Sequence, residues 1–103
     1  MDDALRERIK STIESKKVVL FMKGSRNFPQ CGFSAHVVGI LKEHAADFRD
    51  VNILTDPDLR QGLKEYSNWP TFPQLYVDGK LVGGADIVSS MHESGELTGV
   101  LGG

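Results

Sequence analysis

The sequence predicts an α/β fold in which a central mixed four-stranded sheet is flanked by helices. Residues 18–22 form a continuous apolar run of strand length, which is typical of a strand buried on both faces. Apolar residues recur at helical spacing before this run, directly after Cys31 and again after Pro57. Farther along, Asp78-Gly79 between two apolar stretches predicts a tight antiparallel hairpin.

The first half of the chain predicts a helix, a strand, a second helix and a second strand. Asp2 or Asp3 can cap the first helix, whose apolar residues between 5 and 13 recur every four positions. The strand of residues 18–22 then changes at Lys23-Gly24 into a loop. A helix with a broad apolar stripe follows Cys31, and the apolar-polar alternation of residues 48–53 predicts the next strand.

The second half predicts a helix, a hairpin and a last helix. Asp56 as cap and Pro57 at the first helical position mark a helix start, and the buried stripe of that helix is expected to be Leu59, Leu63 and Tyr66. Residues 67–73 contain two prolines within four positions, which indicates a loop. The hairpin strands are expected at 75–77 and 80–82, followed by a last helix that Asp86 caps.

The order of these elements determines how the sheet is connected. A strand, a helix and a strand in succession make a right-handed parallel crossover, whereas the hairpin adds antiparallel strands. Helices can then cover both faces, which is the thioredoxin-like arrangement. Because 103 residues suffice for one ordinary core, a single domain is expected over residues 1–103.

Composition narrows the class of function. A formal net charge of −2 and a pI near 5.9 leave no basic footprint, so neither nucleic acid nor a membrane is expected as a partner. The single cysteine excludes an intrachain disulfide, although a disulfide with another molecule remains open. His36, His44 and His92 are scattered without metal-site spacing, and we expect them to be surface residues rather than ligands.

Cys31 is the candidate chemical group, because it stands where a loop that follows a buried strand enters a helix. The positive end of the helix dipole favours a thiolate over a thiol, and Lys23 adds to this effect if the loop folds back. A thiolate is both a nucleophile and a metal ligand. The alternative is that Cys31 is a buried, inert core residue, as many lone cysteines are.

Three separated motifs resemble those of the monothiol glutaredoxins of the CGFS type. They are Cys31-Gly32-Phe33-Ser34, Trp69-Pro70-Thr71-Phe72-Pro73 and Gly83-Gly84-Ala85-Asp86, and the resemblance extends from about Val18 to Leu97. It implies a thioredoxin-like glutaredoxin domain that binds glutathione beside Cys31. Phe33 and Trp69 are expected to pack near this site.

The resemblance implies which residues bind glutathione. Lys23 and Arg60 are cations that could hold its glycine carboxylate, and Lys64 is a third candidate. For each of them, the alternative is simple solvated surface charge.

Backbone groups complete the implied glutathione site. A cis bond between Phe72 and Pro73 would present the Phe72 backbone to glutathione as to an added strand, and the alternative is an ordinary proline loop. The N–H groups of Ala85 and Asp86, with the Asp86 carboxylate, could bind the γ-glutamyl end. Many family members have a cysteine where this chain has Ala85. Because that cysteine is missing here, an internal disulfide with Cys31 is not expected.

The resemblance also implies what Cys31 does. With Ser34 in place of a resolving cysteine, a disulfide at Cys31 needs an external thiol for its resolution. The implied function is that of an iron–sulfur carrier: two protomers each contribute Cys31, two glutathiones contribute the other sulfurs, and the [2Fe–2S] cluster passes to apo-proteins. The alternative is an oxidoreductase that deglutathionylates proteins with Cys31 as its redox-active, catalytic residue.

The implied assembly is a homodimer when the cluster is bound and a monomer without it, with BolA-like proteins as possible hetero-partners. A soluble protein in a reducing compartment is expected, because cluster assembly requires one. The plastid stroma, the bacterial cytoplasm and the mitochondrial matrix all satisfy this condition.

Overall fold

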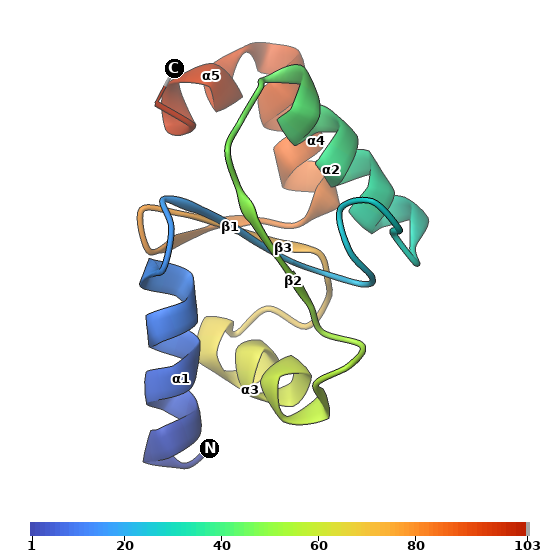
Figure 1. The fold of residues 1–103 in the computed structure, drawn as a ribbon. Coiled ribbons are helices and arrows are strands. Elements are labelled where there is room, and N and C mark those ends of the chain that lie inside the picture. The colour runs from blue at the N-terminus through green and yellow to red at the C-terminus, as the bar shows by residue number, and fades with distance from the viewer. Residues whose placement is uncertain (103) are drawn as a thin grey trace.

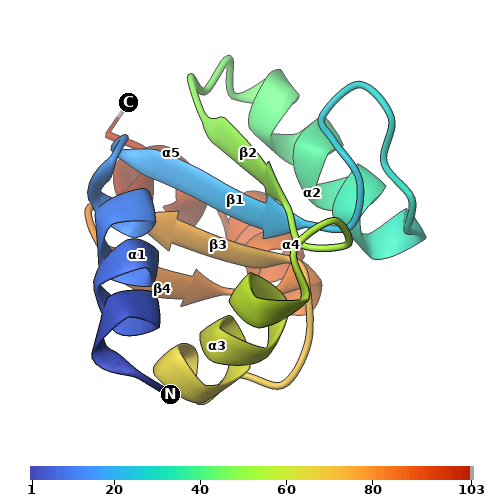
Figure 2. The ribbon, with the colours of Figure 1, turned by 60° about the horizontal axis from the view of Figure 1, so that its bottom comes forward.

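The computed structural model describes residues 1–102 and contains the predicted sheet. Its strands are β1 (Val18–Met22), β2 (Arg49–Asn52), β3 (Gln74–Val77) and β4 (Lys80–Gly83). They lie in the order β2-β1-β3-β4 (Figure 2). β1 pairs in parallel with β2 and antiparallel with β3, and β3 pairs antiparallel with β4. The prediction of a mixed four-stranded sheet is therefore confirmed.

Helices cover both faces of this sheet, as Figure 1 shows. On one face lie α1 (Asp3–Glu14) and α3 (Pro57–Ser67), and on the other lie α2 (Gly32–Glu43), α4 (Ala85–Ser94) and α5 (Glu96–Val100). No helix among the described residues has the length and apolar character that crossing a membrane requires.

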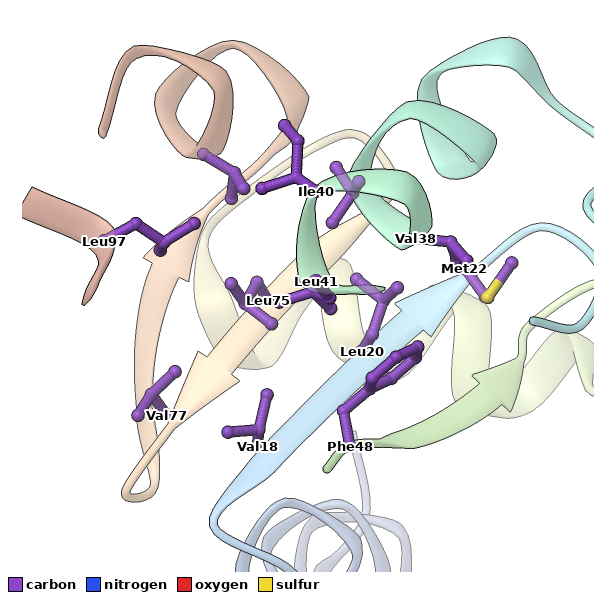
Figure 3. Packing of buried hydrophobic residues seen from close by; sticks show 12 residues of the cluster. Val18, Leu20, Met22, Val38, Ile40, Leu41, Phe48, Leu75, Val77 and Leu97 are labelled. Carbon is purple, nitrogen blue, oxygen red and sulfur yellow. The ribbon is translucent and has the colours of Figure 1, made fainter. Parts of the chain in front are cut away.

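Strand β1 lies at the centre of two hydrophobic cores. Because successive side chains of a strand point to opposite faces, Val19 and Phe21 pack under α1 and α3. Leu20 and Met22 belong to the other core, with residues of α2 and α4 (Figure 3). All four side chains are fully buried, and each contributes about 1.5–3 kcal/mol by leaving water. This burial explains the continuous apolar run and anchors the loop that follows the strand.

Residues close in sequence determine where two helices start and where the hairpin turns. The Asp2 carboxylate accepts a hydrogen bond from the Leu5 N–H at 2.7 Å, and Asp56 caps α3 in the same way. In the hairpin, Asp78 and Gly79 have φ values of 52° and 79°, as a two-residue turn of the predicted kind requires.

Three expectations about the helices are wrong. Asp86 does not cap α4: Gly84 holds that position with extended backbone, and Asp86 lies in the first turn. Tyr66 is 39% exposed, because the buried face of α3 runs through Gly62, where a Cβ would lie 2.9 Å from side-chain atoms of α1. The chain also continues beyond α4, since Gly95 at a φ of 87° ends that helix and α5 follows.

Candidate functional site

Cys31 lies at the junction that the sequence predicts. The loop after β1 brings it to the N-cap of α2, with extended φ and ψ of −152° and 137°, and its carbonyl accepts the Ala35 N–H at 2.9 Å. Its side chain is partly exposed rather than buried in the core. The structure therefore supports the reactive alternative and not the inert one.

The surroundings of Cys31 lower the pKa of its thiol. The backbone N–H of Ser34 has the largest effect, and the Phe33 N–H and the positive charge of Lys23 act in the same direction against partial burial. The sulfur makes no full capping hydrogen bond, so these N–H groups act mainly through the field at the helix N-terminus. The prediction that the helix N-terminus and Lys23 favour the thiolate is confirmed, because both lower the pKa of Cys31.

Ser34 has a structural role that the sequence does not reveal. Its side chain is fully buried, and its hydroxyl oxygen accepts the backbone N–H of Lys23 at 3.1 Å. This bond joins the end of β1 to the first turn of α2. Ser34 therefore holds Lys23 close to the helix turn that follows Cys31. It also occupies the position at which a dithiol glutaredoxin has its second cysteine.

The loop between β1 and α2 is held against β2. The Gly24 N–H donates to Oδ1 of Asn52 at 3.0 Å, and Arg26 pairs with Asp50 at 3.1 Å while its guanidinium stacks 4.0 Å from the Phe48 ring centroid. Burial of Asp50 disfavours its ionised form, but the bonds from Arg26 outweigh this effect and lower the Asp50 pKa. These contacts hold the segment that delivers Cys31.

An open cavity of about 670 Å³ lies beside Cys31. All seven residues that the resemblance implies for the site line it: Lys23, Cys31, Arg60, Phe72, Pro73, Ala85 and Asp86. Lys64 and Trp69 line it too, as does Phe33, which is 63% exposed and therefore not a packing residue as expected. The cavity also includes Ile87, one position after Asp86, which sequence reasoning missed.

Three cations line this cavity. Lys23 follows β1, whereas Arg60 and Lys64 lie one turn apart on α3. Within residues 1–102, none of the three forms an ion pair. Because none of them is paired with an acidic side chain in that part of the chain, the cavity suits a ligand with carboxylates.

Another part of the cavity wall is built around the predicted cis peptide bond. The Phe72–Pro73 bond is cis, which confirms that expectation. The buried Gln74 side chain donates to the carbonyl oxygens of Trp69 and Thr71 at 3.1 and 3.3 Å and so holds the preceding loop. The β1–β3 pairing ends at Gln74, so Phe72 lies beyond the paired part of the strand.

The N-terminus of α4 also lines the cavity. A Cβ at Gly84 would lie 3.2 Å from Nε1 of Trp69 and 3.3 Å from the carbonyl oxygen of Pro73, so the absent side chain permits this close approach. Gly84 offers no side-chain cap, and Ala85 and Asp86 follow in the first turn. First-turn N–H groups of this kind can bind an anionic group.

A second hollow of about 470 Å³ adjoins the first at Cys31. It is lined by Phe33 and His36 of α2 and by Ala85 and Ser89 of α4, among others. The His36 ring and the Ser89 hydroxyl are 3.2 Å apart. Cys31 therefore borders two open spaces. Among residues 1–102, no three His, Cys, Asp or Glu side chains are grouped to hold a metal ion.

Comparisons with known proteins identify the family. The glutaredoxin family model matches residues 18–82. A chloroplastic monothiol glutaredoxin-S14 of Arabidopsis thaliana is 58% identical over 93 residues, which cover 90% of this chain and 54% of the relative. A probable monothiol glutaredoxin 2 of Rickettsia conorii is 54% identical, with 90% of this chain and 87% of the relative covered.

Solved structures agree with this assignment. The reduced apo form of poplar GrxS14 is 58% identical, with a TM-score of 0.81, covering 92% of this chain and 87% of the poplar chain. A buckwheat glutaredoxin solved as a glutathione complex is 21% identical with a TM-score of 0.83, which shows the shared fold alone.

The relatives differ greatly in length. The chain spans about half the length of the Arabidopsis S14 protein, and only 20% of two longer plant relatives, the S11 protein of rice and the S17 protein of Arabidopsis. What those whole proteins do therefore does not transfer directly. The fold, the family-model match and the identity to chains that carry the monothiol name support one conclusion: this chain belongs to the glutaredoxin family and is a monothiol glutaredoxin of the CGFS type.

Proposed function

We propose that this chain binds glutathione in the Cys31 cavity and, as a glutathione-bridged homodimer, carries a [2Fe–2S] cluster that it transfers to apo-proteins. One observation carries the proposal: a partly exposed thiol with a lowered pKa, three cations that form no ion pair within residues 1–102, and a helix N-terminus all border the same open cavity. Glutathione offers a thiol and two carboxylates, which match these three features in kind.

Each part of glutathione has a chemical partner on the cavity wall. Lys23 and Arg60, with Lys64 nearby, suit the glycine carboxylate. The backbone at Phe72, just before the cis bond to Pro73, suits the extended peptide. The first turn of α4, at Ala85 and Asp86, suits the γ-glutamyl carboxylate and amine. This division would place the glutathione sulfur next to Cys31.

A cluster needs four sulfur ligands, and one chain provides a single thiolate. Two chains with two bound glutathiones supply four. A ligand of this kind must be deprotonated and reachable, and the lowered pKa of Cys31 favours the first condition while its partial exposure meets the second. The cluster is cargo in this scheme, and its release would need only exchange of four labile thiolates with an acceptor.

The partners follow from the proposed cargo. We expect apo iron–sulfur proteins as acceptors and BolA-like proteins as possible hetero-partners, with a monomer in the absence of cluster. Such chemistry requires a reducing compartment, and chloroplastic and bacterial relatives are consistent with the plastid stroma or the bacterial cytoplasm. The mitochondrial matrix satisfies the same requirement.

The decisive test is anaerobic reconstitution with iron, sulfide and glutathione, followed by visible absorption and gel filtration. We expect a coloured dimer with two glutathiones, which is lost in Cys31→Ser and when dithiothreitol replaces glutathione. Arg60→Gln should weaken glutathione binding, whereas Arg6→Gln, on the exposed surface of α1, should not. A colourless monomer from the wild-type chain would exclude the carrier function.

A second candidate function is deglutathionylation, which the lowered pKa and exposure of Cys31 favour. The Cys31 thiolate attacks the glutathione sulfur of a protein–glutathione disulfide, so a Cys31–glutathione bond forms and the protein leaves as a thiolate. A second glutathione thiolate then attacks the bound glutathione sulfur and releases glutathione disulfide and free Cys31. Steady-state turnover comparable with that of a dithiol glutaredoxin would favour this enzyme function, and near-zero turnover would favour the carrier.

A further inference from the structure

Two histidines meet where α2 and α4 end. His44 caps the C-terminus of α2, His92 lies in the last turn of α4, and Nε2 of His44 is 3.0 Å from Nδ1 of His92. The two rings stand nearly edge to face, with centroids 5.1 Å apart. On its other side, Nε2 of His92 lies 3.1 Å from Oε2 of Glu43. Carboxylate, imidazole and imidazole thus form a connected series.

This cluster is separate from the Cys31 cavity. Helices α2 and α4 pack side by side (Figure 1), and their N-terminal ends meet at Cys31 and Ala85. His44 follows Cys31 by thirteen residues, which in a helix corresponds to about 20 Å. A ligand at the C-terminal ends would therefore not contact the thiol.

We propose that His44 and His92 form a binding site for a divalent late first-row transition metal, Cu²⁺ or Ni²⁺, with water completing the coordination. The observation that carries it is the separation of the two facing nitrogens. With metal–nitrogen bonds of about 2.0 Å, nitrogens 3.0 Å apart subtend about 97° at the metal. This value is near the right angle between neighbouring ligands in the tetragonal geometry of Cu²⁺ and Ni²⁺, and smaller than the tetrahedral angle that Zn²⁺ prefers.

Glu43 completes the arrangement. A metal-bound histidine usually donates its other ring N–H to a carboxylate, which fixes the tautomer and strengthens the ligand. Oε2 of Glu43 lies 3.1 Å from Nε2 of His92 and is placed to accept its N–H in this way, which puts a lone pair on Nδ1 of His92. In the structure that nitrogen is hydrogen-bonded to Nε2 of His44, and a bound metal would replace the proton that the two nitrogens share. The side chain of His92 is 34% exposed and His44 is half-buried, so water can reach the remaining positions.

The site is invisible in the sequence, which led us to expect surface histidines. His44 and His92 are 48 residues apart and share no motif; only the packing of α2 on α4 joins them. The inference does not depend on glutathione or on the cluster, because it uses neither Cys31 nor the cavity beside it.

Isothermal titration of untagged protein with Ni²⁺ tests the site directly. The Cys31→Ser background removes the competing thiolate and makes the result independent of the proposed function. We expect one Ni²⁺ per chain, at least tenfold weaker binding in His44→Gln and in His92→Gln, and about tenfold weaker binding in Glu43→Gln. His36→Gln, which removes the third histidine, is the matched control and should bind like the parent.

Two further readouts keep the outcome unambiguous. Ni²⁺ should raise the melting temperature of the parent but not of His92→Gln, because only the native parent binds the metal. Cu²⁺ bound to the parent should show coupling to two imidazole nitrogens in its electron paramagnetic resonance spectrum. Absence of binding in the parent, or equal binding in the parent and in folded His44→Gln and His92→Gln, would overturn the proposal.

Discussion

Replacing Ser34 by alanine should destabilise the fold more than any exposed serine replacement. The hydroxyl oxygen of Ser34 accepts the Lys23 N–H at 3.1 Å and is fully buried, so no water can replace it without rearrangement. Leaving a buried donor without its acceptor costs about 1–3 kcal/mol. For a domain of this size, a loss of 2 kcal/mol lowers the melting temperature by roughly 8–16 °C.

Urea unfolding followed by circular dichroism measures this loss. With an m-value of about 1–3 kcal/mol per molar urea, the midpoint should fall by about 1 M. Ser11→Ala, at an exposed position of α1, is the control and should change the free energy of unfolding by no more than about 0.5 kcal/mol. Equal midpoints for Ser34→Ala and Ser11→Ala would refute the structural role of the hydroxyl.

The same variant tests how the thiolate is stabilised. The backbone N–H of Ser34 has the largest effect on the Cys31 pKa and remains in Ser34→Ala, whereas the hydroxyl has the smallest of the stated effects. The thiol pKa should therefore rise but stay below that of a free cysteine, as measured by the pH dependence of iodoacetamide alkylation. A return to the free-cysteine value would show that the side chain, and not the helix backbone, stabilises the thiolate.

Three other predictions follow from the same contacts. Lys23→Gln should raise the Cys31 pKa, because a positive charge is removed; alkylation rates that keep the wild-type pH profile would contradict this. The hydrogen bond from Arg8 lowers the pKa of Asp56 in the folded state. The ionised Asp56 carboxylate therefore stabilises the fold fully above the unfolded pKa of about 3.9, and this stabilisation is lost as the pH falls through the lower folded pKa. Asp56→Ala should cost about 0.5–2 kcal/mol at pH 7, and urea unfolding near pH 2 should show little difference from the wild type. Gly24→Ala should cost about 1–3 kcal/mol in thermal unfolding, because Gly24 has a φ of 91° and a Cβ would lie 2.5 Å from a backbone oxygen; a wild-type melting temperature would contradict the loop geometry.

Much of the fold could be predicted because it depends on neighbours in sequence. The run of residues 18–22, the cap at Asp56 and the turn at Asp78-Gly79 are local signals, and each element was found where they predict it. Five of the seven site residues lie in the three motifs that carry the family resemblance, and the other two, Lys23 and Arg60, could be named as the cations that the resemblance requires. The structure brings all seven to one cavity.

What could not be predicted depends on contacts between distant segments. Asp86 has the side chain of a good cap, but the close packing of Gly84 on Trp69 and Pro73 starts α4 earlier, so Asp86 falls within the first turn. Tyr66 continues the apolar spacing of α3, yet α1 crosses that helix at Gly62 and leaves the tyrosine partly exposed. A pattern within one helix cannot show where a second helix will cross it.

The two hollows beside Cys31 differ in charge, and this difference bears on the proposed function. Lys23, Arg60 and Lys64 line only the larger cavity, whereas the second hollow contains neither lysine nor arginine among its lining residues. Glutathione, an anionic tripeptide, should therefore prefer the larger cavity. The second hollow is then the side from which a second molecule would reach Cys31. In a carrier that side must admit a second copy and its glutathione, and in a transferase it must admit the protein part of a protein–glutathione disulfide. Both functions would use the same thiolate, so the surface around the second hollow, where Phe33 is 63% exposed, is the part of the molecule that can distinguish them.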